Sequence, residues 1–315
     1  MNEINYHKFI SWLLLRFAVY GPKQKGERVC FGKIKTAGEI EFYAKPFYPL
    51  REFFLPCPET LHQNGKNDIA AANSEGRKRI ILNIPLYDLE ALSYLMIIFG
   101  RDPYFQKHLR NTVICGISAV PDDNSFAQKF EDKILRHLKF DLYFDQNKDG
   151  SFRLFTGSEQ GQKILETFGE KDYAHIEYRG PLNNLSFFPS KIKEKIKASR
   201  GAKIWKDLGK KCLACGKCSL VCPLCYCYDL KTSSEGKVSR EWGNCFYSEF
   251  SEVAGGHKFL KNIEERIYNW YDHKFARMIE EYGFAGCVQC GRCSDVCPAG
   301  INIKENLKKI NKICA

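Results

Sequence analysis

The sequence predicts an α+β protein in which a mixed α/β domain, residues 1–190, precedes a helical domain, residues 191–315. Three observations support this division. Eleven of the fifteen cysteines lie between Cys212 and Cys297, so they form one local block. Upstream of that block, short β-branched runs alternate with amphipathic stretches, which is typical of strand–helix–strand succession. A chain of 315 residues also gives room for two hydrophobic cores.

The N-terminal domain is predicted to contain a mixed or partly parallel sheet, because helical stretches separate its strand signals. The β-branched run Arg79–Ile84 indicates a buried strand, and Pro85 ends it. The predicted elements, in chain order, are a helix at Tyr6–Val19, strands at Val29–Ile34, Glu39–Tyr43 and Arg79–Ile84, a helix from Asp88 to about Phe99, a strand at Asn111–Ser118, a helix at Phe126–His137, strands at Phe140–Phe144 and Phe152–Phe155, and a helix at Glu159–Phe168. No glycine-rich phosphate loop follows a predicted strand, so a nucleotide pocket is not predicted.

Two copies of one cysteine frame, C-x2-C-x2-C-x3-C-P, lie in the C-terminal domain. The copies are Cys212, Cys215, Cys218 and Cys222 before Pro223, and Cys287, Cys290, Cys293 and Cys297 before Pro298. This spacing wraps three thiolates around a [4Fe–4S] cluster, while the fourth cysteine ligates the other cluster of the pair. We therefore expect two clusters and a role in moving electrons. The expected ligands are Cys212, Cys215, Cys218 and Cys297 for the first cluster, and Cys287, Cys290, Cys293 and Cys222 for the second.

The residue types in the frame suit this chemistry. Soft thiolates favour iron in clusters, and Gly216 and Gly291 tolerate the left-handed backbone angles that such tight loops need. Zinc is the main alternative, because paired C-x-x-C motifs also build zinc sites. A third cysteine two residues further on, with Cys-Pro behind it, is unusual for zinc. Disulfides fit less well, since the spacing is too tight for most of the possible pairs.

Helices are expected to surround the cysteine frames, at Lys191–Leu208, Ile263–Tyr282 and Lys304–Ile313. Sixty-four residues separate Cys222 from Cys287, more than a compact two-cluster ferredoxin needs between its halves. Long helices that lead into each frame indicate a helical ferredoxin-like domain rather than the small β-rich kind.

Three further cysteines between the frames allow a third metal site. Cys225, Cys227 and Cys245 would bind it, with His257 as the fourth ligand. The alternative is that these thiols line the clusters or pack as small apolar groups. Core or surface roles are expected for the isolated cysteines, which are Cys30, Cys57, Cys115 and Cys314.

The net charge of +11 is concentrated at the start of the C-terminal domain. Nine cations stand there against Glu194 and Asp207; they are Lys191, Lys193, Lys195, Lys197, Arg200, Lys203, Lys206, Lys210 and Lys211. A solvated linker helix or a docking surface for an acidic subunit is the favoured interpretation, and nucleic-acid binding by a cluster-stabilised protein is the alternative. No signal peptide is visible and the apolar run Phe9–Phe17 is too short to span a membrane, so a cytoplasmic location is expected.

The chain resembles the iron–sulfur β subunit of cytoplasmic sulfhydrogenases, the NAD(P)-linked [NiFe] hydrogenases, and the related electron-transfer subunit of anaerobic sulfite reductases. The first frame, with Cys225, Tyr226 and Cys227 behind it, carries most of this resemblance. The remaining shared elements are Trp242 with Cys245, Ala254–His257, His273–Phe275, and, more faintly, Phe53–Pro56, Glu59–Leu61, Asp88–Leu92 and Asp102–Phe105.

The resemblance implies an electron-transfer subunit without catalytic residues of its own. It would work between a flavin-bearing partner that reacts with NAD(P)H and a [NiFe] hydrogenase module, or alternatively a sulfite-reducing module. The α/β domain would then serve in docking. The chain departs from the family at Tyr87, where relatives tend to have cysteine, and at Asp122–Phe126, where they tend to have Cys-x-Cys.

Lys217 and Arg292 occupy matching places in the two frames. A cation beside a cluster favours the more negative reduced state and so raises the potential, unless solvent screens it. The alternative is that both side chains are exposed and equivalent.

Overall fold

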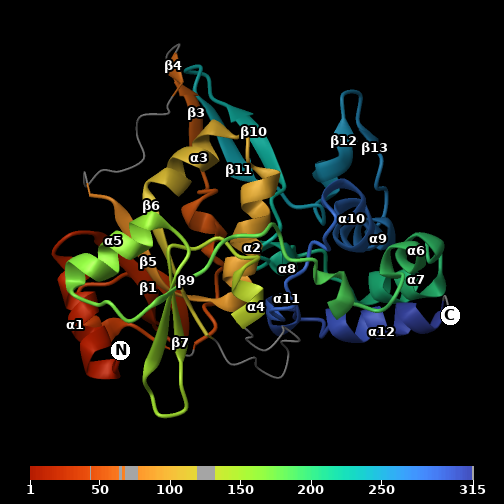
Figure 1. Ribbon diagram of the computed structural model, residues 1–315. Coiled ribbons are helices and arrows are strands. Elements are labelled where there is room, and N and C mark those ends of the chain that lie inside the picture. Colours follow the sequence, from red (N-terminus) through yellow and green to blue (C-terminus); the bar gives the residue numbers. More distant parts are fainter. Residues whose placement is uncertain (43, 64–65, 68–76, 119–131, 314–315) are drawn as a thin grey trace. The chain divides into compact units, whose positions relative to one another are not determined.

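The computed structural model describes the chain except for residues 43, 64–65, 68–76, 119–131 and 314–315 (Figure 1). It divides into two units. The first comprises the described residues of 1–182 together with Thr232–Val238, and the second comprises the described residues of 183–231 and 239–315. The predicted α+β class is confirmed, while the exact domain boundary near residue 190 stays a prediction. Within the described part of the chain, no helix is long and apolar enough to cross a membrane.

The first unit is built on a seven-stranded mixed sheet with the order β2-β1-β5-β6-β7-β8-β9. The central strands β1, β5, β6 and β7 run parallel, and antiparallel pairs join β1 to β2 and β7 to β8. The strands of this sheet are β1 (Ala18–Lys25), β2 (Arg28–Lys33), β5 (Arg79–Pro85), β6 (Thr112–Ile117), β7 (Leu142–Gln146), β8 (Phe152–Thr156) and β9 (Ala174–His175).

The helices of the first unit are α1 (Glu3–Leu14), α2 (Leu86–Ile98), α3 (Pro103–Arg110), α4 (Asp132–Leu135) and α5 (Glu159–Phe168), with 3₁₀ turns at Ala37–Glu39 and Leu50–Phe53. One core cluster joins α1 to the sheet, and Tyr6, Phe9 and Phe144 lie fully inside it. Strand β6 is buried along its whole length, as its apolar sequence predicts for a central parallel strand.

A smaller sheet has the order β10-β11-β3-β4. Its strands are β3 (Glu59–Gln63), β4 (Lys66–Asn67), β10 (Tyr228–Thr232) and β11 (Val238–Trp242). The tip of the β10–β11 hairpin, residues 232–238, groups with the first unit. This hairpin lies in the segment between the cysteine frames, for which the sequence predicted only the helix Ile263–Tyr282.

The second unit is mainly helical. Its helices are α6 (Ile192–Ala198), α7 (Lys203–Lys211), α8 (Lys217–Leu220), α9 (Ile263–Asp272), α10 (Met278–Tyr282), α11 (Arg292–Asp295) and α12 (Ile303–Ile313), with 3₁₀ turns at Asn184–Phe187 and Ser248–Ser251 and a hairpin of β12 (Glu252–Val253) and β13 (His257–Lys258). A π-helical turn, His273–Arg277, joins α9 to α10. An apolar core of Trp205, Trp270, Tyr271 and Phe275 packs these helices together.

Three predicted helices end or break earlier than expected. The first helix stops at Leu14, and Val19 instead pairs with Ile80 in the parallel sheet, because sheet formation outweighs the local helical pattern. The predicted helix Lys191–Leu208 is two helices, α6 and α7, since Gly201 adopts a left-handed angle of 79° between them. The first half of the predicted helix Phe126–His137 lies outside the described residues, and in its second half α4 ends at Leu135, two residues before His137.

The predicted strand Glu39–Tyr43 is also wrong in the residues described. A 3₁₀ turn at Ala37–Glu39 replaces its start, and Tyr43 is outside the described residues. The antiparallel partner of β2 is β1 on its N-terminal side. Pro22 within β1 pairs with Phe31 of β2, so the proline did not prevent a strand here.

Candidate metal centres

The two cysteine frames fold into loops of the same conformation. In the first, Ala214 and Gly216 have φ angles of 50° and 70°; in the second, Gln289 and Gly291 have 60° and 78°. The left-handed glycines predicted from the sequence are therefore confirmed. In each loop a backbone N–H also points at the first sulfur, from Ala214 N to Cys212 Sγ and from Gln289 N to Cys287 Sγ, both at 3.4 Å.

Gly216 has a second, steric reason to be glycine. A Cβ at this position would lie 2.1 Å from Nδ2 of Asn244, whose side chain crosses the loop. Asn244 donates from this nitrogen to the Gly216 carbonyl at 2.9 Å, so the close approach is part of how the loop is held.

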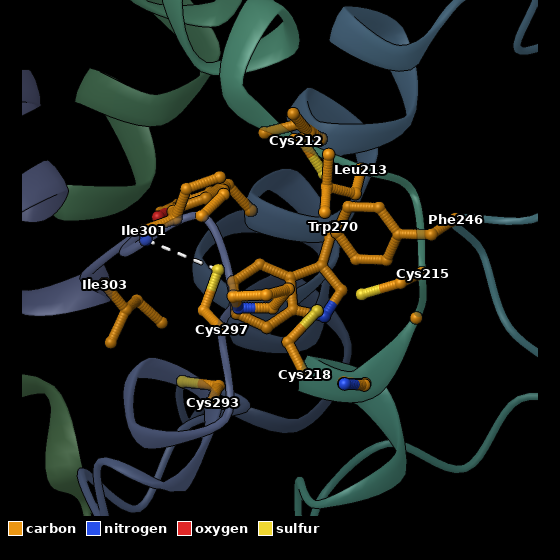
Figure 2. A pocket seen from close by; sticks show the side chains of 16 residues that line it. Cys212, Leu213, Cys215, Cys218, Phe246, Trp270, Cys293, Cys297, Ile301 and Ile303 are labelled. Carbon is orange, nitrogen blue, oxygen red and sulfur yellow. Dashed lines mark hydrogen bonds between the residues drawn. The ribbon is translucent and has the colours of Figure 1, made fainter.

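The first frame surrounds a cavity that is also lined by two cysteines of the second frame. The five cysteines around it are Cys212, Cys215, Cys218, Cys293 and Cys297. Figure 2 shows these side chains around one pocket, together with Phe246 and Trp270. The Ile301 amide donates to Cys297 Sγ at 3.3 Å, which orients that sulfur (Figure 2). The remaining walls, including Ile267 and Ile303, are mostly apolar, and Lys217 is the cation that lines this cavity.

The second cavity has the reciprocal composition. Three of its cysteines come from the second frame and one from the first; they are Cys287, Cys290, Cys293 and Cys222. Leu224, Val288 and Ile303 complete apolar walls, and Lys274 is the cation that lines this cavity. Each group of four cysteines that the spacing predicted thus lines one cavity, but Cys293 lines both, and the assignment of ligands to two clusters stays a prediction.

The two cavities share a wall, because Trp270, Cys293 and Ile303 line both of them. The indole Nε1 of Trp270 is buried and has no hydrogen-bond partner among the residues that the structure describes. A buried N–H without an acceptor is costly. A sulfur-rich group in either cavity would supply that acceptor, so the residues present fit iron–sulfur clusters.

A buried asparagine from a distant segment fastens each frame. Asn244 holds the first loop at Gly216 and also accepts from the Phe246 amide. Asn184 holds the second: its Nδ2 donates to the carbonyls of Ala285 and Cys287 at 3.1 and 3.2 Å, and its Oδ1 accepts from the Ala285 amide at 2.9 Å. Neither asparagine was predicted from the sequence, since no spacing rule marks them.

The two loops differ sharply in exposure. Leu213 of the first loop is 67% exposed, whereas Val288 at the matching position is 3% exposed. Cys215 is exposed, whereas Cys290 is 7% exposed. The alternative view of Lys217 and Arg292 as equivalent exposed residues is wrong, because Arg292 is buried while Lys217 is exposed.

Lys274 is a buried lysine between the two frames. It lies in the π-helical turn and is 3% exposed. Its Nζ donates to Cys222 Sγ at 3.1 Å and to the Gly286 carbonyl at 2.9 Å. Burial alone would lower the pKa of Lys274, but the sulfurs of Cys222, Cys225 and Cys287 hold that pKa well above its usual value.

Burial also affects the thiols of both cavities. Desolvation raises the pKa of Cys218, in the first cavity, to about 12, and it raises the pKa of Cys287, in the second, to about 12. Metal ligation requires thiolates. Loading either cavity with iron therefore has to release protons.

The residues of the predicted third site are only partly together. Cys227 and Cys245 are hydrogen-bonded through their sulfurs, which raises the pKa of Cys245. His257 is exposed in β13 with its ring edge against Phe259. Within the described residues, no three His, Cys, Asp or Glu side chains are placed to hold a single metal ion. The third site stays a prediction.

The remaining positions singled out from the sequence lie in the first unit or outside the described residues. Cys115 is fully buried in the sheet core, Cys30 is half-buried in β2, and Cys57 is exposed. Tyr87, where relatives tend to have cysteine, is buried in α2. Asp122–Phe126 and Cys314 lie outside the described residues.

Comparison with known proteins agrees with this site. Residues 211–301 match the family model of a 4Fe–4S dicluster domain. The chain is 27% identical to sulfhydrogenase 2 subunit beta of Pyrococcus furiosus, over 94% of this chain and 92% of that protein. It is 30% identical over 100 residues to a putative pyruvate-flavodoxin oxidoreductase of Synechocystis, which is 32% of this chain and 7% of that protein. No solved structure gave a significant match.

The resemblance to the iron–sulfur beta subunit of sulfhydrogenases is thereby confirmed. A dicluster domain occupies the C-terminal part of the chain and implies two [4Fe–4S] clusters.

Proposed function

We propose that this chain is an electron-transfer subunit that holds two adjacent [4Fe–4S] clusters between the redox modules of a larger complex. The observation that carries the proposal is the pair of cavities, each lined by the first three cysteines of one frame and the last cysteine of the other, with Cys293 lining both. Bound clusters of this kind accept and donate single electrons. The shared wall of Trp270, Cys293 and Ile303 supports transfer between them, because it makes the cavities direct neighbours.

The proposed ligands are the eight cysteines of the frames. Cys212, Cys215, Cys218 and Cys297 would hold one cluster, and Cys287, Cys290, Cys293 and Cys222 the other. We propose no catalytic residue in this chain, and the end reactions then belong to other subunits.

The hydrogenase partner is proposed from the similarity to the Pyrococcus sulfhydrogenase subunit, which covers nearly the whole chain, and the flavin partner from the family resemblance of the cysteine frames. One is a flavin-bearing protein that reacts with NAD(P)H, and the other is a [NiFe] hydrogenase module. The first unit of this chain would serve in docking. The experiment described below distinguishes a hydrogenase partner from a sulfite-reducing partner.

The first cavity is the proposed contact point for an acidic redox partner. Exposed Leu213 and Cys215 place this cavity next to solvent. Lys210, Lys211 and Lys217 are exposed beside it. A basic surface around an accessible redox centre steers an acidic partner toward it. Weaker electron transfer at high salt is therefore expected for this step.

Anaerobic purification of the native complex tests the proposal. We expect about eight iron atoms per chain and two cluster signals by electron paramagnetic resonance. About twelve iron atoms per chain would indicate that the third site also binds iron. Zinc in place of iron would contradict the proposal. Co-purification of a nickel-containing protein supports the hydrogenase assignment, whereas a sirohaem protein would replace it with sulfite reduction. Salt-sensitive nucleic-acid binding without redox activity would favour the alternative class.

A further inference from the structure

We propose that Lys274 is a positioning residue that raises the reduction potential of the second cluster relative to the first, through its hydrogen bond to Cys222 Sγ and its buried charge. This inference rests on the two-cluster function proposed above. It makes the two clusters differ in reduction potential, although their cysteine frames have the same spacing.

The first observation is the path of the lysine side chain. The Lys274 carbonyl accepts from the Gly286 amide at 2.7 Å, and Nζ donates back to the Gly286 carbonyl at 2.9 Å. Gly286 immediately precedes the second frame, and a Cβ there would lie 2.2 Å from Met278 Sδ. The lysine is thus clamped at both ends to the entry of the second frame. Its remaining contact reaches the sulfur of Cys222.

The second observation is the missing carboxylate. Within the described residues, Lys274 forms no ion pair with Asp or Glu; its contacts are Cys222, Gly286 and the ring of Trp270 at 5.1 Å. A buried cation is costly unless an anion compensates it. The anion that this geometry provides for is a thiolate-ligated cluster in the cavity that Lys274 lines.

The third observation is the local backbone. Lys274 lies in a π-helical turn, and such turns occur frequently at functional sites. The neighbouring cation Arg277 belongs to the same turn but points to solvent and pairs with Asp272 at 2.9 Å. Only one of the two cations is therefore buried against a cavity.

The sign of the effect follows from electrostatics. Reduction makes the cluster more negative, so a nearby cation stabilises the reduced form and raises its potential. Solvent screens the charge little, because Lys274 is 3% exposed. Hydrogen bonds to the ligand sulfurs act in the same direction. Lys274 does not line the first cavity, so its effect there is expected to be smaller.

The test compares redox titrations of the holoprotein and three variants. Lys274→Met removes both charge and donor, and Lys274→Gln keeps an N–H donor without charge. Arg277→Met is the matched control. We expect Lys274→Met to lower the reduction equilibrium constant of one cluster at least tenfold, about 59 mV for one electron. The Gln variant should fall between Met and wild type, and the control should match wild type. An unchanged potential in Lys274→Met with both clusters retained, equal shifts of both clusters, or a similar shift in the control would overturn the proposal.

A measurement on the wild-type protein covers the case in which both Lys274 variants lose the cluster. With ¹⁵N-lysine labelling, pulsed electron paramagnetic resonance of the reduced protein should detect a lysine nitrogen coupled to one cluster. Absence of that coupling would overturn the proposal. Failure of the two-cluster function is distinguishable, because wild-type protein would then lack two cluster signals altogether.

Discussion

The two cysteine frames share a loop conformation but have opposite surroundings. The first presents Leu213 and Lys217 to solvent, whereas the second buries Val288 and Arg292 at the same positions. Ligand spacing therefore determines the backbone of the loop, and the helices and segments packed around it determine its environment. Exposed cations act weakly through screened charge, while buried ones act strongly. One sequence motif thus yields an accessible centre and an enclosed one.

The reciprocal ligation can be broken most completely with paired cysteine variants. If Cys212 and Cys297 bind the same cluster, Cys212→Ala with Cys297→Ala should retain the other cluster, about four iron atoms per chain. Cys287→Ala with Cys297→Ala should lose both clusters. Iron quantitation after anaerobic purification measures the difference. The opposite pattern would mean that each frame ligates its own cluster with all four cysteines.

The asparagines that fasten the loops give the next largest effect. Asn184→Ala removes the acceptor of the Ala285 amide and the side-chain donor to the Cys287 carbonyl. Asn244→Ala removes the acceptor of the Phe246 amide and the side-chain donor to the Gly216 carbonyl. Each substitution should lower the free energy of unfolding by about 1–3 kcal/mol. Each should also release mainly the cluster bound by the loop that the asparagine holds. Denaturant-induced cluster loss measures this, with Asn311→Ala, which removes the acceptor of Lys195, as the surface control. Equal cost in all three variants would refute the assigned roles.

The difference in exposure predicts unequal lability. Under an iron chelator or limited oxygen, the cluster beside exposed Cys215 should be lost about tenfold faster than the cluster beside buried Cys290. The absorbance decay should therefore be biphasic, with about half of the iron in each phase. Salt should leave the slow phase unchanged. A single phase would show that the two centres are equally accessible in solution.

The raised thiol pKa values predict the smallest effect, on cluster assembly. The pKa values of Cys218 and Cys287 are both raised to about 12, so at neutral pH these thiols are protonated in the empty cavities. Raising the pH increases the thiolate fraction about tenfold per unit below that pKa. Reconstitution of the empty protein should then become severalfold faster between about pH 7 and pH 9. Preloaded protein, whose ligands are already deprotonated, should keep its iron content over the same interval; an assembly rate independent of pH would count against the proton release.

The sequence predicted well what local rules determine. The spacing of the cysteines predicted both loops and the left-handed backbone of Gly216 and Gly291. The apolar β-branched runs predicted β5 and β6. The partners that depend on distant segments could not be found this way. Asn184, Asn244 and Lys274 act through contacts that follow from the packed helices, and no spacing marks them.

Strand and helix ends were missed for a similar reason. Val19 continues a helical pattern but pairs with Ile80 in the sheet. The β10–β11 hairpin lies in a stretch for which no element was predicted, although β10 alternates apolar and polar residues from Tyr228 to Lys231. All five residues of β10 are exposed, so its pairing with β11, not a buried face, holds the strand. In these places tertiary pairing, not local preference, decides the structure.

The exchange of one cysteine between the frames also makes each proposed cluster a cross-link. The hairpin turn around Gly236 is exposed and lies between the frames, so a protease could cut the chain there. Each resulting piece would carry ligands of both clusters, and the pieces would stay joined through iron until the metal was removed. Such a bridge closes a loop of 64 residues between Cys222 and Cys287, and long closed loops restrict the unfolded chain most.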